Sequence, residues 1–114
     1  MLLLYIQKVT IMLIYNNLRI GEKILEKIHD KHQVTLLEIE ECFTNREKKF
    51  LFDRRVDHQT KPPTRWFISE TDQGRLLKII FIKLFNGMFE IKTAFEPNKT
   101  EVDIYEKYAK KDTS

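Results

Sequence analysis

The strongest constraint on the fold is an apolar stretch, Leu76 to Leu84, in which only Lys78 and Lys83 interrupt the hydrophobic residues. A strand that is apolar on both faces is buried on both faces, and such strands lie in the middle of a sheet. The stretch is bounded by a turn at Asp72-Gln73-Gly74 and by Asn86-Gly87, a strong signal for a tight hairpin. We therefore predict a central strand over 75–84 with an antiparallel neighbour on each side.

Three further segments fit those neighbours. We predict strands near 50–54, 65–70 and 88–95, with Pro62-Pro63 breaking the chain before the second of them. The last segment alternates in character, which predicts that one face carries Phe89, Ile91, Thr93 and Phe95. On the central strand, either Leu77, Ile79 and Phe81 or the alternate residues face the helices.

Helical patterns flank the predicted sheet. Residues 22–31 have helical apolar spacing, and Thr35 with Glu38 forms a Ser/Thr-x-x-Glu capping box that opens a second helix. A terminal helix begins at Asn98 or Thr100. The predicted fold class is α+β, with two N-terminal helices, a sheet of about four antiparallel strands, and a C-terminal helix.

Size and cysteine content indicate one domain in a reducing compartment. A chain of 114 residues is one domain of ordinary size, and its one cysteine, Cys42, cannot form an intramolecular disulfide. Residues 1–15 are apolar but interrupted, too short to span a membrane and unlike a secretory signal. We expect a cytoplasmic protein, with 1–15 serving as an added edge strand or a leader, and Met12 as an alternative start.

Positive charge is concentrated between residues 46 and 65. This segment has seven basic and three acidic residues, a net charge of +4, whereas the whole chain has +3. A local basic concentration with aromatic residues is typical of a surface that binds RNA or DNA. The alternative is a solvated loop that binds nothing. If it binds RNA, the contacts are expected from Arg54, Arg55, Lys61, Trp66 and Lys83.

Four short motifs follow one another along the chain. They are Lys31-His32-Gln33-Val34-Thr35 with Glu38, Glu41 and Phe43; Arg65-Trp66-Phe67-Ile68; Gly74-Arg75-Leu76-Leu77; and Thr93-Ala94 with Glu101 and Tyr105. Together they resemble BrnT-type toxins from about His29 to Tyr108. The sequence is also similar to a divergent subgroup often labelled ADP-ribosyl-dinitrogen-reductase hydrolase. That activity needs a two-metal carboxylate site, and the sequence has no such constellation.

The resemblance implies a RelE-like fold over 21–108 and a bacterial ribonuclease toxin held inactive by a cognate antitoxin. The implied partners are the antitoxin and RNA, with the ribosome as a further candidate. One departure weakens this reading, because Phe95-Glu96-Pro97 stands where the family has basic residues. The alternative to a ribonuclease toxin is therefore a non-catalytic RNA- or protein-binding module of the same fold.

Metal-independent RNA cleavage needs a base, an acid and cations that stabilise the phosphate. The candidates are His58, Arg65, Lys92, Glu96 and Tyr105. Each has a structural alternative: solvation for His58, a salt bridge for Arg65, solvent exposure for Lys92, helix capping for Glu96 and core packing for Tyr105. If the site exists, His58, Arg65 and Lys92 should meet on one open face of the sheet.

We expect no cofactor and no metal. His29, His32 and Cys42 fall short of the four ligands that a closed zinc site requires. No glycine-rich phosphate loop or nucleophile elbow is present in the sequence.

Overall fold

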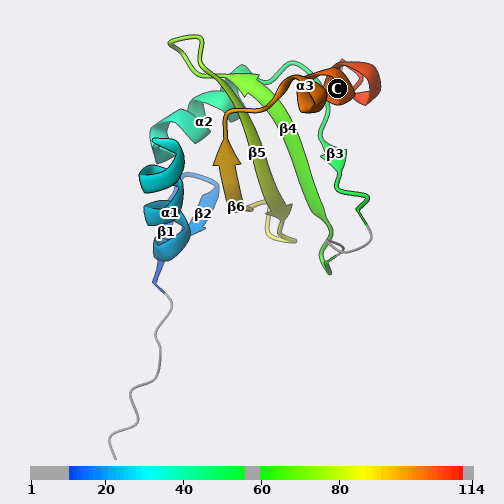
Figure 1. Ribbon diagram of the computed structural model, residues 1–114. Helices are drawn as coiled ribbons and strands as arrows, with labels where there is room; N and C mark the ends of the chain where they lie inside the picture. Colours follow the sequence, from blue (N-terminus) through cyan, green and yellow to red (C-terminus); the bar gives the residue numbers. More distant parts are fainter. Residues whose placement is uncertain (1–10, 56–59, 112–114) are drawn as a thin grey trace, which may run out of the picture.

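The structure, a computed structural model, describes residues 11–55 and 60–111 (Figure 1). The elements, in chain order, are β1 (Met12–Tyr15), β2 (Leu18–Gly21), α1 (Glu22–His32), α2 (Leu36–Asn45), β3 (Leu51–Phe52), β4 (Thr64–Glu70), β5 (Leu76–Lys83), β6 (Phe89–Phe95) and α3 (Lys99–Tyr108). Among these residues, no helix is both long enough and apolar enough to cross a membrane.

The strands form one six-stranded mixed sheet in the order β1-β2-β6-β5-β4-β3. The predicted arrangement, two helices before a four-stranded antiparallel sheet, is wrong, and so is the RelE-like arrangement that the resemblance implies. The N-terminal hairpin β1–β2 adds two strands, and β2 pairs with β6 in parallel, with Leu18 opposite Phe89. Strand β2 was not predicted, because it begins directly after the β1–β2 turn and is followed without a loop by α1.

Capping boxes mark the beginnings of α2 and α3. Thr35 and Glu38 bond reciprocally at the start of α2, and Asn98 and Glu101 do the same at α3. Each box satisfies backbone N–H groups that a helix start leaves without partners. Between α1 and α2, Gln33 adopts a left-handed conformation with φ of 52°, which ends α1 and reverses the chain.

The core lies between the sheet and helices α1 and α2. Leu77, Ile79 and Phe81 of β5 are fully buried on this face, so the first of the two predicted sets faces the helices. Phenylalanine rings from α2, β4, β5 and β6 meet there, with edge-on and stacked contacts. These aromatic contacts add to the free energy gained from apolar burial.

A β-bulge in β6 breaks its predicted alternation. Ile80 pairs with Thr93 but Phe81 pairs with Ile91, so Lys92 is the extra residue. Phe89 and Ile91 therefore face the core with Ala94, whereas Thr93 and Phe95 lie on the other face with Ile80 and Lys78. The prediction that one face carries all four alternating residues of β6 is wrong for this reason.

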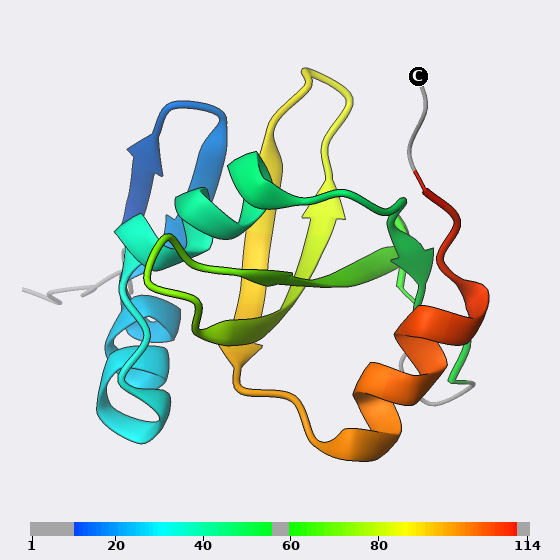
Figure 2. The ribbon, with the colours of Figure 1, turned by 90° about the horizontal axis from the view of Figure 1, so that it is seen from above.

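Helices α2 and α3 cover opposite faces of β4. Phe43 of α2 packs against Phe67 with ring centroids 4.7 Å apart, and Tyr105 of α3 packs against Trp66 at 5.6 Å. Trp66 and Phe67 are consecutive in a strand, so their side chains point to opposite faces. Figure 2 shows α3 (orange to red) at the right of the sheet, away from α1 and α2 (cyan to green).

Candidate nucleic-acid interface

One end of the sheet brings together the start of β4, the end of β5 and the β5–β6 turn, seen at the bottom of Figure 1. In the strand register Arg65 lies opposite both Phe52 and Phe81. Lys83 shares the face of Phe81 and is the diagonal neighbour of Arg65, a relation that sets backbones about 7–8 Å apart. Two cations therefore lie side by side at this end.

Arg65 is held by an aromatic ring, and no acid pairs with it within 11–55 and 60–111. Its guanidinium carbon lies 4.5 Å from the centroid of the Phe52 ring. Its Nε is buried and has no hydrogen-bond partner. The cation–π contact orients the guanidinium but does not neutralise its charge. Its charge is therefore not neutralised by any acid that the structure describes.

Three further cations lie on segments at the same end of the sheet as Arg65. Arg54, Lys61 and Lys83 are exposed and have no ion pair with any carboxylate that the structure describes. Arg55 differs, because its guanidinium contacts both carboxylate oxygens of Asp53 at 3.0 and 2.8 Å. We call Arg54, Lys61, Arg65 and Lys83, with the rings of Phe52 and Phe85, the basic end.

Two exposed aromatic rings belong to the basic end. Phe85 in the β5–β6 turn is fully exposed, and the Phe52 residue is 44% exposed. Neither phenylalanine was among the residues that we predicted to bind RNA, although a phenylalanine next to the Asn86-Gly87 turn is a signal, since turn residues usually face solvent. Trp66, which we predicted to bind RNA, points to the other face, where it contacts Tyr105 and where Lys78 Nζ lies 4.5 Å from its ring.

Lys92 is not part of the basic end. Its Nζ lies 2.8 Å from Glu90 Oε2. Glu90 also lies 3.2 Å from Arg19 Nε, in an ion pair too poorly angled to count as a hydrogen bond. Glu90 is opposite Ile82, on the face away from Arg65 and Phe81. The prediction that Arg65 and Lys92 meet on one face is therefore wrong.

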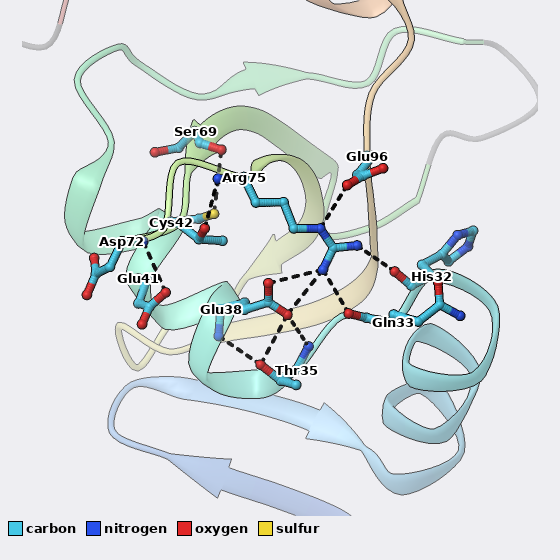
Figure 3. A network of polar contacts seen from close by, with 11 residues as sticks. His32, Gln33, Thr35, Glu38, Glu41, Cys42, Ser69, Asp72, Arg75 and Glu96 are labelled. Carbon is cyan, nitrogen blue, oxygen red and sulfur yellow. Dashed lines mark hydrogen bonds and ion pairs between the residues drawn. The ribbon is translucent and has the colours of Figure 1, made fainter.

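Glu96, a predicted catalytic base, instead belongs to a network around Arg75 (Figure 3). Arg75 Nε donates to Glu96 at 2.9 Å and Nη1 donates to Glu38 at 3.0 Å. The same guanidinium donates to the backbone carbonyls of His32 at 2.6 Å and Gln33 at 2.8 Å. The network joins the α1–α2 junction to the start of β5 and the end of β6, so it stabilises the packing of these segments.

Tyr105 is buried in the packing of α3. Its hydroxyl donates to the carbonyls of Lys48 and Lys49 at 3.2 and 3.0 Å. Burial raises the pKa of the Tyr105 hydroxyl to about 12, so this group stays protonated near neutral pH. The core-packing alternative for this residue matches its position.

His58 lies outside the described residues. Among the residues considered as metal ligands, His29 is exposed and contacts Asp30, while Cys42 is buried and donates to the Ser69 carbonyl. Nowhere in 11–55 or 60–111 do three His, Cys, Asp or Glu side chains gather in a way that could hold a metal ion.

A cavity elsewhere in the described part of the chain is lined mainly by acidic side chains, in contrast to the basic end. It has a volume of about 820 Å³ between the end of α2, the end of β4 and α3, and its lining includes Glu47, Glu70, Asp72 and Glu106 with Lys48. Clustered carboxylates repel phosphate, so a nucleic acid is expected to favour the basic end over this cavity.

No family model matches the chain, and no curated protein or solved structure is significantly similar to it.

Proposed function

We propose that this protein binds single-stranded RNA through the basic end. The observation that carries the proposal is Arg65, a cation oriented by Phe52 and without an acidic partner among the described residues. Arginine held in this way suits phosphate, because its planar fork makes two parallel hydrogen bonds to phosphate oxygens. Lys83, Arg54 and Lys61 supply further phosphate contacts.

The exposed rings favour a single strand over a duplex. Unpaired bases stack on aromatic side chains with a contribution of about 1–3 kcal/mol per base, and this stacking tolerates any base. Phe85 and Phe52 offer such rings beside the cations. The double helix hides the faces of its bases, so it would engage the cations alone.

The test is fluorescence anisotropy with a labelled single-stranded RNA of mixed sequence, titrated at several salt concentrations. Four phosphate contacts predict a log–log salt slope of about −2.8, from about −0.7 per phosphate. Arg65→Ala should weaken binding and make the slope shallower by about 0.7, while Phe85→Ala should weaken binding with the slope unchanged. Lys99→Ala is the control, because Lys99 is an exposed cation on α3, paired with Asp103. Equal weakening by Lys99→Ala and Arg65→Ala would refute a localised site.

A second proposal adds cleavage of the bound RNA by an antitoxin-controlled endoribonuclease. Arg65 supports it, as the predicted phosphate clamp that has no acidic partner in the described chain. Metal-independent cleavage predicts RNA fragments in the presence of a chelator. His58→Ala and Arg65→Ala should each abolish them without lowering the melting temperature. If wild type binds RNA but leaves it intact, and induction does not arrest growth, the binding proposal stands without the nuclease.

A further inference from the structure

Within residues 11–55 and 60–111, the outer edge of the sheet at β1 lacks the features that usually protect an edge strand. Exposed edges in natural proteins are blunted by lysine, proline, bulges or covering loops. Residues 11–18 contain no charged residue and no proline, and β1 pairs with β2 without a register shift. Figure 2 shows β1 (dark blue) as the strand at the left of the sheet.

Alternate backbone groups of β1 point away from the sheet. Glu22 N–H donates to the Ile11 carbonyl at 2.8 Å, so Ile11 directs its backbone groups toward β2. In an antiparallel pair this orientation alternates, so Leu13 and Tyr15 also bond to β2. The N–H and C=O groups of Met12 and Ile14 are therefore directed away from β2, to the outer edge of the sheet.

Apolar side chains flank this edge on both faces. Ile14 is 67% exposed on the face of Arg19. Leu13 lies opposite the buried Ile20 on the core face, yet it is exposed, as are Ile11 and Tyr15. Outward backbone groups without a partner in the described part of the chain, together with apolar side chains on both faces, make this edge suited to pairing with another strand.

The opposite edge of the sheet is a poor partner for β1. Strand β3 has only two residues, Leu51 and Phe52, and lies between Lys49 and the Arg54-Arg55 pair. Two chains of net charge +3 approach with least repulsion where neither carries a cation. The uncharged β1 edge meets that condition, and the basic end lies across the sheet from it.

We propose that two copies of this chain associate through β1, antiparallel and about a twofold axis at Leu13. This register places Met12 opposite Ile14 of the second copy, so each such pair exchanges both of its outward backbone hydrogen bonds. The opposed side chains are Met12 with Ile14, Leu13 with Leu13, and Ile11 with Tyr15, all apolar or aromatic. The contact is isologous and closes at two copies.

The mass of the full chain in solution tests the proposal. Across a dilution series from micromolar to millimolar, light scattering should give twice the 13.8 kDa mass of one chain. Ile14→Pro removes an outward N–H and is compatible with an edge position, so it should be monomeric and keep the far-ultraviolet spectrum of wild type. Ile14→Lys should also be monomeric. If the proline variant misfolds, the mass of the Ile14→Lys variant tests the association through β1 in its place. Ile104→Lys, an exposed isoleucine on α3, should remain dimeric.

Engineered cysteines test the register. Leu13→Cys places two thiols across the axis, and oxidised glutathione, which accepts their electrons and protons, should join them into a covalent dimer. Ile14→Cys should crosslink far less, because its opposite residue is Met12. The native Cys42 is fully buried and gives little background. A wild-type protein that has the mass of a monomer at every concentration would overturn the proposal, also if it pairs with a different protein. Equal crosslinking of the Leu13→Cys and Ile14→Cys variants would overturn it as well.

Discussion

Replacing Arg75 by methionine should remove the polar network of Figure 3 while keeping the apolar stem of the side chain. Two hydrogen bonds reach the backbone carbonyls of His32 and Gln33, and ion pairs reach Glu38 and Glu96. We assign about 1 kcal/mol to each carbonyl bond. The half-buried pair with Glu38 adds about 1 kcal/mol, and the more exposed pair with Glu96 adds about 0.5 kcal/mol or less. The expected loss of unfolding free energy is about 3 kcal/mol.

Urea unfolding followed by circular dichroism measures this loss directly. At about 4 °C per kcal/mol for a domain of this size, the melting temperature should fall by about 12 °C. Arg75→Lys should recover only part of the loss, because one ammonium cannot reproduce the planar fork. Lys99→Ala, which removes an exposed pair with Asp103, should cost less than about 0.5 kcal/mol. An Arg75→Met protein as stable as the Lys99→Ala protein would refute the role of the network.

Three further outcomes are expected. Leu77→Asp should abolish the cooperative urea transition, because it buries an unpaired charge at a fully buried position of β5; a cooperative transition would contradict the central place of β5. Cys42 should react slowly with a thiol reagent until urea unfolds the chain, because burial raises the pKa of its thiol to about 12; fast reaction of the folded protein would count against this. Burial alone would raise the pKa of Glu38, but hydrogen bonds from Thr35 and Arg75 outweigh it and lower that pKa below its usual 4.5. Stability from Glu38 should therefore be complete above about pH 4.5 and decline as the pH falls below it, and Glu38→Gln should make that decline shallower than in wild type.

The features predicted correctly depend on neighbours in the sequence. Thr35 and Glu38 are three residues apart, and their reciprocal bonds require nothing from the rest of the chain. The turn glycines follow the same logic: Gly74 and Gly87 adopt φ of 83° and 82°, where other residues are strained. The long apolar run marks β5 as central because both of its faces must be covered.

What the sequence did not reveal depends on contacts between distant segments. The parallel pairing of Leu18 with Phe89 has no local signature, so the mixed character of the sheet was missed. The extra residue at Lys92 looks like ordinary alternation in the sequence. Whether Glu96 is free or paired depends on Arg75, another distant partner. Local chemistry therefore suggests candidate residues but does not indicate which of them lie together.

The parallel pairing of β2 with β6 imposes an order on folding. Two helices and three strands separate these strands in the sequence, so their contact closes a long loop and is among the slower contacts to form. An isolated two-stranded hairpin is marginal in water, so we expect β1–β2 to be stable in the sheet once β6 pairs with β2. During synthesis, the β1–β2 hairpin must therefore wait until Phe89 has left the ribosome, and its apolar edge is exposed to other nascent chains for that interval.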